Sequence, residues 1–250
     1  MTQGSLILNF FEKVCRSNIY FFLISRYLIG KYFSKIIYDN DFKLIKILEN
    51  NKFFKGKKLI IDIGANDGMS YKIIRKFTKK TKIVSFEPNE FNFNTLKKIE
   101  FKDKLFTCEK VALSSSKKKQ PFFTPYFKKY IISQMAGLSK SGIKKKLQTS
   151  LHVKDLLKKI VIKKEIFYTK KLDDYKFKPS FIKIDIEGHE YECILGSLKT
   201  IKKYKPIIMV EYDKIVCDKI YILLKKLNYQ KYVYNKLKRK VEKFSGQKIF

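Results

Sequence analysis

Short apolar runs alternate with amphipathic stretches along most of the chain, and this alternation predicts strands that are linked by helices. The apolar runs suit buried strands at 59–63, 82–88, 105–113, 181–185 and 206–211. Helical spacing follows at 70–79, 90–101, 191–204 and 214–227. Strands and helices that alternate in this way form a parallel sheet with helices on both faces. We therefore expect an α/β fold, and a chain of 250 residues that is 45% apolar can bury one sizeable core.

Two later segments depart from this alternation. Residues 231–234 and 240–244 flank a short polar connection, which predicts an antiparallel hairpin at the end of the sheet. Residues 114–169 form an insertion with clustered aromatic residues, two Lys-Lys-Lys runs and a strand at 161–168. Aromatic rings offer flat faces to sugars, and lysines hold phosphate or carboxylate groups, so the insertion could form a ligand pocket. A solvent-exposed surface segment that forms no ligand pocket would fit the same pattern.

The N-terminal 55 residues differ from the rest of the chain. Residues 5–37 are rich in Phe, Ile, Leu and Tyr with charged residues interspersed, which predicts two amphipathic helices, and a short third helix is expected at 41–50. The uncharged run 17–25 is far shorter than the ~20 residues that span a bilayer. A basic n-region and a small-residue cleavage site are missing, so a signal peptide is not expected. We interpret residues 1–55 as a helical extension that covers the ligand edge of the sheet as a lid. A peripheral membrane anchor is the alternative.

The first predicted strand runs directly into a turn with two glycines. Gly64 and Gly68 carry no Cβ, so the backbone can approach a ligand closely. Ligands of open parallel sheets bind at this carboxyl end of the strands. The spacing G-x-x-x-G is not the dinucleotide fingerprint, and Met69 and Ser70 stand where a P-loop has Lys and Ser or Thr. This segment taken alone is also compatible with an ordinary βα turn.

A carboxylate ends the second predicted strand. Glu87 follows Asp62 by 25 residues, which is one βαβ step and close to the ~20 residues between a phosphate turn and a ribose-binding acid in nucleotide folds. Two carboxylate oxygens can accept hydrogen bonds from two adjacent ribose hydroxyls, each worth about 1.5–3 kcal/mol. We therefore expect Glu87 to bind a ribose. Capping of the following helix is the alternative role.

Acidic residues gather at the predicted ligand edge, although basic residues outnumber acidic ones 56 to 23 in the chain. Random placement would put lysine at these positions more often. A local negative potential inside a basic protein suits a cationic ligand. Five residues share this placement at or just after a strand end: Asp62, Glu87, Asp185, Glu187 and Glu211.

Five segments in order, 61–68, 86–88, 111–115, 181–190 and 210–212, together resemble the FkbM family of methyltransferases. That family transfers methyl groups mainly to hydroxyls of sugars and polyketide-type small molecules. The resemblance covers residues 58–212 and implies a Rossmann-like seven-stranded methyltransferase sheet within a domain at 56–250. It also implies S-adenosyl-L-methionine (SAM) as the cofactor. The implied cofactor-binding residues are Asp62, Gly64, Ala65, Asn66, Asp67, Gly68, Glu87, Ala112, Leu113 and Asp185.

Methyl transfer to a hydroxyl requires alignment of the reacting atoms and a base that removes the hydroxyl proton. Asp185, Glu187 and His189 stand at the ligand edge and are the candidate catalytic residues. His189 could instead cap a helix or pair with an acid. Asp185, Glu187 and Glu211 are also hard oxygen ligands of the kind magnesium prefers, but nothing in their spacing requires a metal, and we expect none.

The expected acceptor is a saccharide or another small molecule, and residues 114–169 are the candidate acceptor pocket. Methylation of a protein, lipid or nucleic acid by the same machinery is the alternative. A third hypothesis is a cofactor-binding protein without catalytic activity that scaffolds glycan assembly. The sequence leaves the oligomeric state open.

The charge of the chain is +33 with a pI of about 9.9, which first suggests a polyanionic partner. Lysine supplies nearly all of the basic residues, however, and only four are arginine. Because bidentate recognition of phosphates and bases favours arginine, we do not expect dedicated nucleic-acid binding. The four cysteines lack C-x-x-C spacing and suit buried thiols in a reducing cytoplasm. Two histidines are too few for a His-rich metal site.

Overall fold

The computed structural model of the protein describes residues 43–50, 52–55, 58–128, 130–132, 135–138, 140–150, 158–211, 213–235 and 240–243. The two N-terminal amphipathic helices expected at 5–37, with their lid or membrane-anchor roles, lie outside this part. The chain divides into two compact units. The larger unit comprises residues 38–120 and 167–250, and the smaller comprises 1–37 and 121–166.

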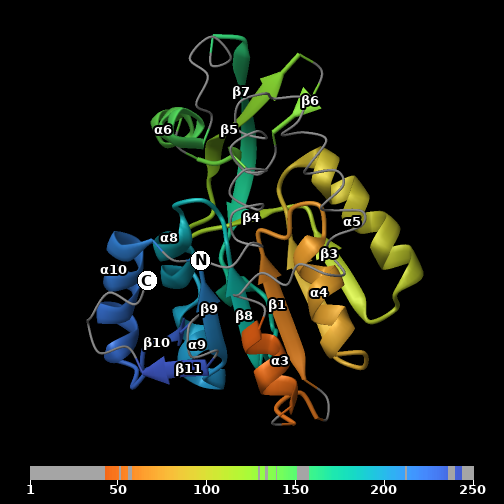
Figure 1. Cartoon of the computed structure of the whole chain (residues 1–250), viewed down its shortest axis with the longest axis vertical. Coiled ribbons are helices and arrows are strands. Elements are labelled where there is room, and N and C mark those ends of the chain that lie inside the picture. The colour runs from red at the N-terminus through yellow and green to blue at the C-terminus, as the bar shows by residue number, and fades with distance from the viewer. Residues whose placement is uncertain are drawn as a thin grey trace, which may run out of the picture. The chain divides into compact units, whose positions relative to one another are not determined.

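The larger unit is built on a five-stranded parallel sheet in the order β3-β2-β1-β8-β9 (Figure 1). The strand order changes direction at β1, which pairs with β2 on one side and with β8 on the other. Asp62 of β1 therefore stands opposite both Ser85 and Lys183. The strands are β1 (Leu59–Ile63), β2 (Lys82–Phe86), β3 (Phe106–Glu109), β8 (Phe181–Ile184) and β9 (Ile207–Val210).

Helices α3, α4 and α5 cover one face of this sheet, and α3 and α4 lie in front of the strands in Figure 1. Their bounds are α3 (Lys43–Asn50), α4 (Met69–Phe77) and α5 (Glu90–Lys102). Ile45 of α3 and Leu96 of α5 are fully buried against strand residues Ile60, Ile83 and Phe181. The short helix expected at 41–50 thus forms part of the core of the larger unit.

Helices α8, α9 and α10 cover the opposite face, where odd-numbered residues of β1 and even-numbered residues of β8 form a second core. The helices are α8 (Glu190–Leu195), α9 (Leu198–Tyr204) and α10 (Lys214–Lys225). Ile61, Ile182 and Ile194 are all fully buried in this cluster. The expected sheet with helices on both faces is therefore confirmed.

The expected single helix at 191–204 is divided into α8 and α9. Gly196 lies at the junction, where an added Cβ would be 1.9 Å from the carbonyl oxygen of Ser114. The chain passes so close to Ser114 that only glycine fits, and Ser197 then donates a hydrogen bond to the Cys193 carbonyl at 2.7 Å. The tertiary contact therefore interrupts a segment with continuous helical spacing.

The expected strand at 105–113 is divided as well. The amide of Val111 donates to the carbonyl of Glu109 at 3.1 Å, and this tight turn ends β3. Residues Ala112–Leu113 then form β4, which pairs with β7 (Ile160–Lys170) outside the main sheet. A four-stranded sheet in the order β4-β7-β5-β6 results, with β5 (Lys119–Phe127) and β6 (Tyr130–Ile131).

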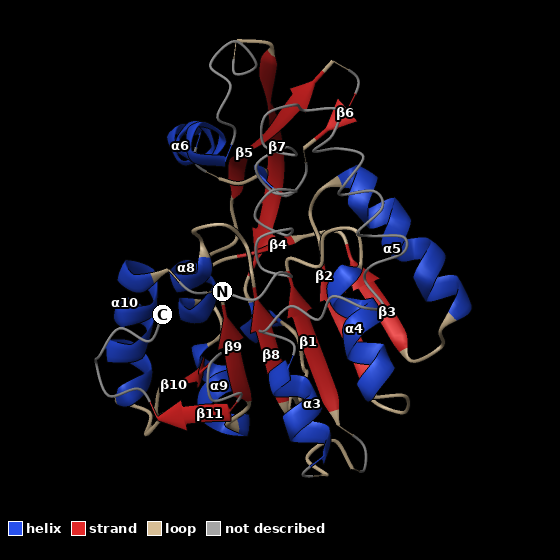
Figure 2. Ribbon diagram, viewed as in Figure 1, coloured by secondary structure: helices blue, strands red, loops and turns tan. Residues whose placement is uncertain are grey.

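The expected seven-stranded sheet has five strands in the described residues. The last two strands, β10 (Tyr232–Asn235) and β11 (Lys240–Lys243), form the predicted antiparallel hairpin, but they pair only with each other (Figure 2). Tyr232 is 55% exposed, and β11 has no buried residue. The hairpin is therefore a separate two-stranded sheet and not part of the five-stranded one.

The smaller unit has a core of its own. Phe127, Ile132 and Met135 pack there with Ile143 and Leu147 of α6 (Lys140–Ser150). Residues 121–166 are thus a folded body in their described part rather than only a solvent-exposed surface segment.

Two further expectations concern cysteines and membranes. Cys108 and Cys193 are buried free thiols, as expected, whereas Cys217 is half-buried.

Within the described residues, no helix combines the length and apolar character needed to cross a bilayer.

Candidate functional site

The turn after β1 is fixed between its two neighbouring strands. The amides of Gly64 and Ala65 both donate to the Phe86 carbonyl, at 3.0 and 3.2 Å. Gly64 has a φ of +79°, and a Cβ there would lie 1.9 Å from the carbonyl oxygen of Asp185. The turn after β1 therefore touches the turn after β8 through a position that admits only glycine.

The remaining predicted turn residues divide into buried and accessible ones. Asp62 and Ala65 are 0% and 1% exposed. Asn66 and Asp67 are half-buried, and Asp67 Oδ1 accepts a hydrogen bond from the amide of Met69 at 3.2 Å. Gly68 is the N-cap of α4 with a φ of +86°. Asn66 and Asp67 are therefore better placed to meet a ligand than Asp62.

Glu87 lies directly after β2 and connects it to the glycine turn. Its Oε2 accepts from the amide of Asn66 at 2.8 Å, and its Oε1 accepts from the amide of Asn89 at 2.9 Å. The cap of α5 is Asn89, whose side chain accepts from the amide of Asn92. Glu87 is thus not the helix cap. The side chain of Asn92 also hydrogen-bonds to Glu87, so three of the about four lone-pair sites of the carboxylate are used inside the protein, and the remaining one can accept a hydrogen bond from a ligand hydroxyl.

We expect the burial of Glu87 to make stability depend on pH. Burial raises the pKa of Glu87 from 4.5 to about 7, although the amides of Asn89 and Asn66 oppose the shift. Folding therefore favours the protonated form, whose contribution to stability is complete below pH 4.5 and is lost as pH rises through 7. Relative to Glu87→Gln, which cannot titrate, the wild type should lose about 3 kcal/mol of unfolding free energy across this range. Urea unfolding of both proteins at a series of pH values measures the difference, and parallel pH profiles would contradict it.

A buried lysine lies beneath the two turns. Lys183 is 4% exposed, and its Nζ is 3.2 Å from Asp62 Oδ1 and 3.4 Å from Asp185 Oδ2. Burial alone would lower the pKa of Lys183, but the charges of Asp62 and Asp185 outweigh burial and hold that pKa above its ordinary value. The ammonium therefore stays charged, and the two aspartates share it.

The turn after β8 is held from within by Glu190, the first residue of α8. Glu190 is 3% exposed, and its Oε1 accepts from the amides of Ile186 and Gly188 at 3.2 and 3.0 Å. Glu187 and Gly188 adopt left-handed backbone conformations, with φ of 58° and 95°. The buried carboxylate thus fixes the backbone that carries Asp185 and Glu187.

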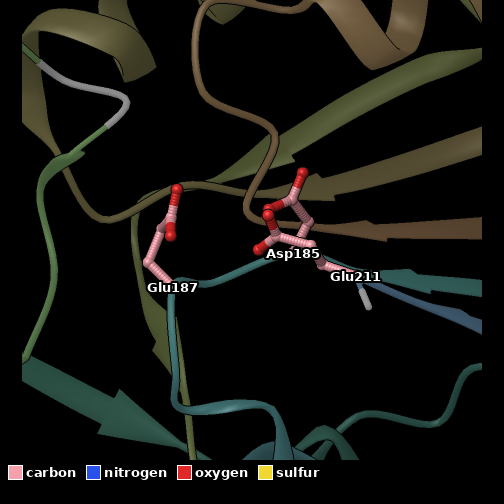
Figure 3. A group of neighbouring side chains, drawn as sticks. All are labelled: Asp185, Glu187 and Glu211. Carbon is pink, nitrogen blue, oxygen red and sulfur yellow. The ribbon is translucent and has the colours of Figure 1, made fainter. Parts of the chain in front are cut away.

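Three carboxylates meet at the carboxyl edge of the sheet. Asp185, Glu187 and Glu211 each place an oxygen within 4.8 Å of the others. Figure 3 shows Asp185 and Glu211 side by side at the strand ends, with Glu187 approaching from the following turn. Such a group of like charges is stabilised by a cation, either an organic one or a divalent metal with hard oxygen ligands.

His189 makes its contact away from this group. Its Nε2 lies 2.9 Å from Ser114 Oγ, which in turn accepts from Gln120 Nε2 at 3.5 Å. Burial lowers the pKa of His189 below 6.5, against the opposing charges of Glu192 and Glu190, so the ring is neutral at pH 7. Because Ser114 engages Nε2, the ring must give up this contact before that nitrogen can take a proton from a ligand.

Ala112 and Leu113, expected beside the cofactor, lie on β4. Leu113 is 2% exposed and packs in the core with α8, whereas Ala112 is half-buried. Of these two residues, only Ala112 is therefore partly accessible to a ligand.

Sequence reasoning assigned no role to Lys183 or Glu190, and it placed Glu211 at the edge without a catalytic role. The signal for Lys183 was present, because a lone lysine interrupts the apolar run 181–184. Its partner Asp62 interrupts the run 59–63 in the same way. Nothing in the sequence pattern, however, states that these two strands are neighbours.

These features define an α/β protein with an open Rossmann-like parallel sheet, whose β1, β2 and β8 turns lie at one carboxyl edge. Residues 62–233 match the family described as the methyltransferase FkbM domain. The match covers more than half of the chain, and the chain belongs to this family.

Two solved structures are similar to the chain. Methyltransferase FkbM from Methylobacillus flagellatus KT has 18% identity and a TM-score of 0.45, covering 79% of this chain and 41% of that one. The N-terminal domain of human METTL16 in complex with SAH has 15% identity and a TM-score of 0.39, covering 77% and 61%. The chain thus spans less than two thirds of either structure. Comparison with curated proteins found no match.

Proposed function

We propose that the protein is a SAM-dependent methyltransferase that acts on a hydroxyl of a saccharide or another small molecule. The observation that supports this proposal most is the convergence of Asp185, Glu187 and Glu211 beside the glycine turn in a chain of charge +33. Within a basic protein, a local group of carboxylates suits a cationic ligand such as a sulfonium cofactor with its ammonium group. Membership of the FkbM methyltransferase family supports the same reaction class.

In this proposal the two halves of the edge have different tasks. Glu87 would accept from a ribose hydroxyl of SAM, and the turn at Gly64 to Gly68 would contact the rest of the cofactor. Asp185 and Glu187 stand where the methyl group is transferred. The protein aligns acceptor oxygen, methyl carbon and sulfur, and a carboxylate removes the hydroxyl proton.

We expect Glu87→Ala to weaken SAM binding about 30- to 150-fold, or about 2–3 kcal/mol, because charge-assisted hydrogen bonding to the ribose is lost. Calorimetric titration of the wild type and the variant with SAM measures this change. Glu87→Gln, which keeps one acceptor oxygen, should lie between them. Exposed Glu109 ends the neighbouring strand, and Glu109→Ala is the matched control. A folded wild type that does not bind SAM would overturn the proposed function.

The acceptor is identified with methyl-labelled SAM and a panel of hydroxylated saccharides. Turnover that is insensitive to salt supports a saccharide or other uncharged small molecule, whereas turnover that falls steeply with salt would favour a nucleic acid. The same assay with EDTA and then added Mg²⁺ tests the carboxylate group for a metal role. Activity that EDTA abolishes and Mg²⁺ restores would contradict the expected metal independence.

A further inference from the structure

Lys183 joins the two turns that form the proposed cofactor site. It stands opposite Asp62 in the register of β1 and β8. Its Nζ is 3.2 Å from Asp62 Oδ1, 3.4 Å from Asp185 Oδ2 and 3.5 Å from the Gly64 carbonyl oxygen. One buried ammonium therefore contacts a central strand, the glycine turn and the turn after β8.

The two aspartates differ in their access to a ligand. The side chain of Asp62 is 0% exposed, so it can interact only with groups inside the protein. Besides Lys183, these include Ser85, whose Oγ donates to Asp62 Oδ2 at 3.4 Å. The side chain of Asp185 is 42% exposed. Of the two carboxylates that contact Lys183, only that of Asp185 is therefore accessible to a ligand.

Resting on the SAM site proposed above, we infer that Lys183 is a positioning residue that fixes Asp185 for the ammonium group of the cofactor. Lys183 holds Oδ2, and the other carboxylate oxygen accepts from the ammonium. The ribose of the adenosine part binds to Glu87, which accepts from the amides of Asn66 and Asn89 and makes no described contact with Lys183. The lysine should therefore affect binding of the amino-acid part of SAM more than binding of the adenosine part.

The experiment must avoid leaving Asp62 buried without a partner, because removing one member of a buried ion pair is strongly destabilising. All variants are therefore made in the Asp62→Asn background, where asparagine keeps the shape without the charge. Four proteins form a cycle: the parent, Lys183→Met, Asp185→Asn and the combination of both. The wild type and each of these four proteins are titrated with SAM and with 5′-methylthioadenosine, which lacks the amino-acid part, and thermal unfolding establishes that each is folded.

We expect each single substitution to weaken SAM binding about tenfold and the combination to weaken it no further, since both remove the same contact. Binding of methylthioadenosine should change less than about twofold across the cycle. Independent losses that multiply to ~100-fold in the combination would overturn the role of Lys183, as would an equal loss of methylthioadenosine binding. If neither ligand binds the wild type, the proposed function fails. If both bind and only the cycle disagrees, the failure is confined to Lys183.

Discussion

Replacing Glu187 by glutamine should lower kcat for methyl transfer about 10²- to 10⁴-fold while SAM affinity changes less than about threefold. The side chain belongs to the group with Asp185 and Glu211, so it lies where an acceptor hydroxyl would lose its proton. Its backbone has a φ of 58°, a left-handed conformation that costs a residue with a Cβ about 1–2 kcal/mol. Single-turnover and steady-state assays with the identified acceptor measure the loss.

The matched control for this prediction is Glu109→Gln, which removes an exposed carboxylate from the same edge of the sheet outside the group. It should leave kcat unchanged. His189→Ala is the informative comparison, because His189 is engaged by Ser114 and should contribute less to catalysis than Glu187. A Glu187→Gln enzyme with full turnover would exclude Glu187 as the base, and a large loss in His189→Ala alone would assign that role to the histidine.

Gly64→Ala should destabilise the protein by about 2–5 kcal/mol. A left-handed conformation disfavours alanine by about 1–2 kcal/mol, and forcing a methyl group into a packed position adds about 1–3 kcal/mol. At Gly64 both conditions hold, because φ is +79° and the new Cβ would meet the Asp185 carbonyl oxygen at 1.9 Å. In a protein of this size the unfolding temperature should fall by roughly 10 °C, which calorimetry or circular dichroism can measure.

Gly188→Ala separates the two causes. Gly188 has a φ of +95°, but an added Cβ would have no atom within 4 Å. Only the backbone contribution of about 1–2 kcal/mol should therefore appear. Equal destabilisation by the two alanines would show that the contact between the turns at Gly64 and Asp185 has no energetic importance.

Most strands and helices of the larger unit could be predicted from local pattern, because each needs only its own residues. The run 59–63 is apolar apart from Asp62, and β1 has those bounds. The expected strand at 105–113 and the expected helix at 191–204 were each divided instead. Val111 turns back to Glu109, and Gly196 lies against Ser114, and both contacts depend on where the chain lies in three dimensions.

The residues of the candidate site likewise divide into those that the sequence could predict and those that it could not. Its acids could be predicted because each follows an apolar run, and carboxyl ends of parallel strands meet at one edge. Their partners could not. Glu190 holds the amides of Ile186 and Gly188, and His189 turns to Ser114, although its sequence position suited a catalytic base equally well. Hydrogen bonds of this kind depend on side-chain direction, which spacing along the chain does not define.

By itself, then, the sequence determined the fold class and which acids stand at the carboxyl edge of the sheet, since hydrophobic period and strand-end placement are local properties. Only the tertiary structure decided that Lys183 lies between Asp62 and Asp185, and that Glu190 holds the turn that carries Asp185 and Glu187. Neighbouring strands of the sheet are far apart in sequence, with Asp62 and Lys183 in register across β1 and β8. The order of strands is set by packing of the whole core, and charges on different strands become partners only once that order exists.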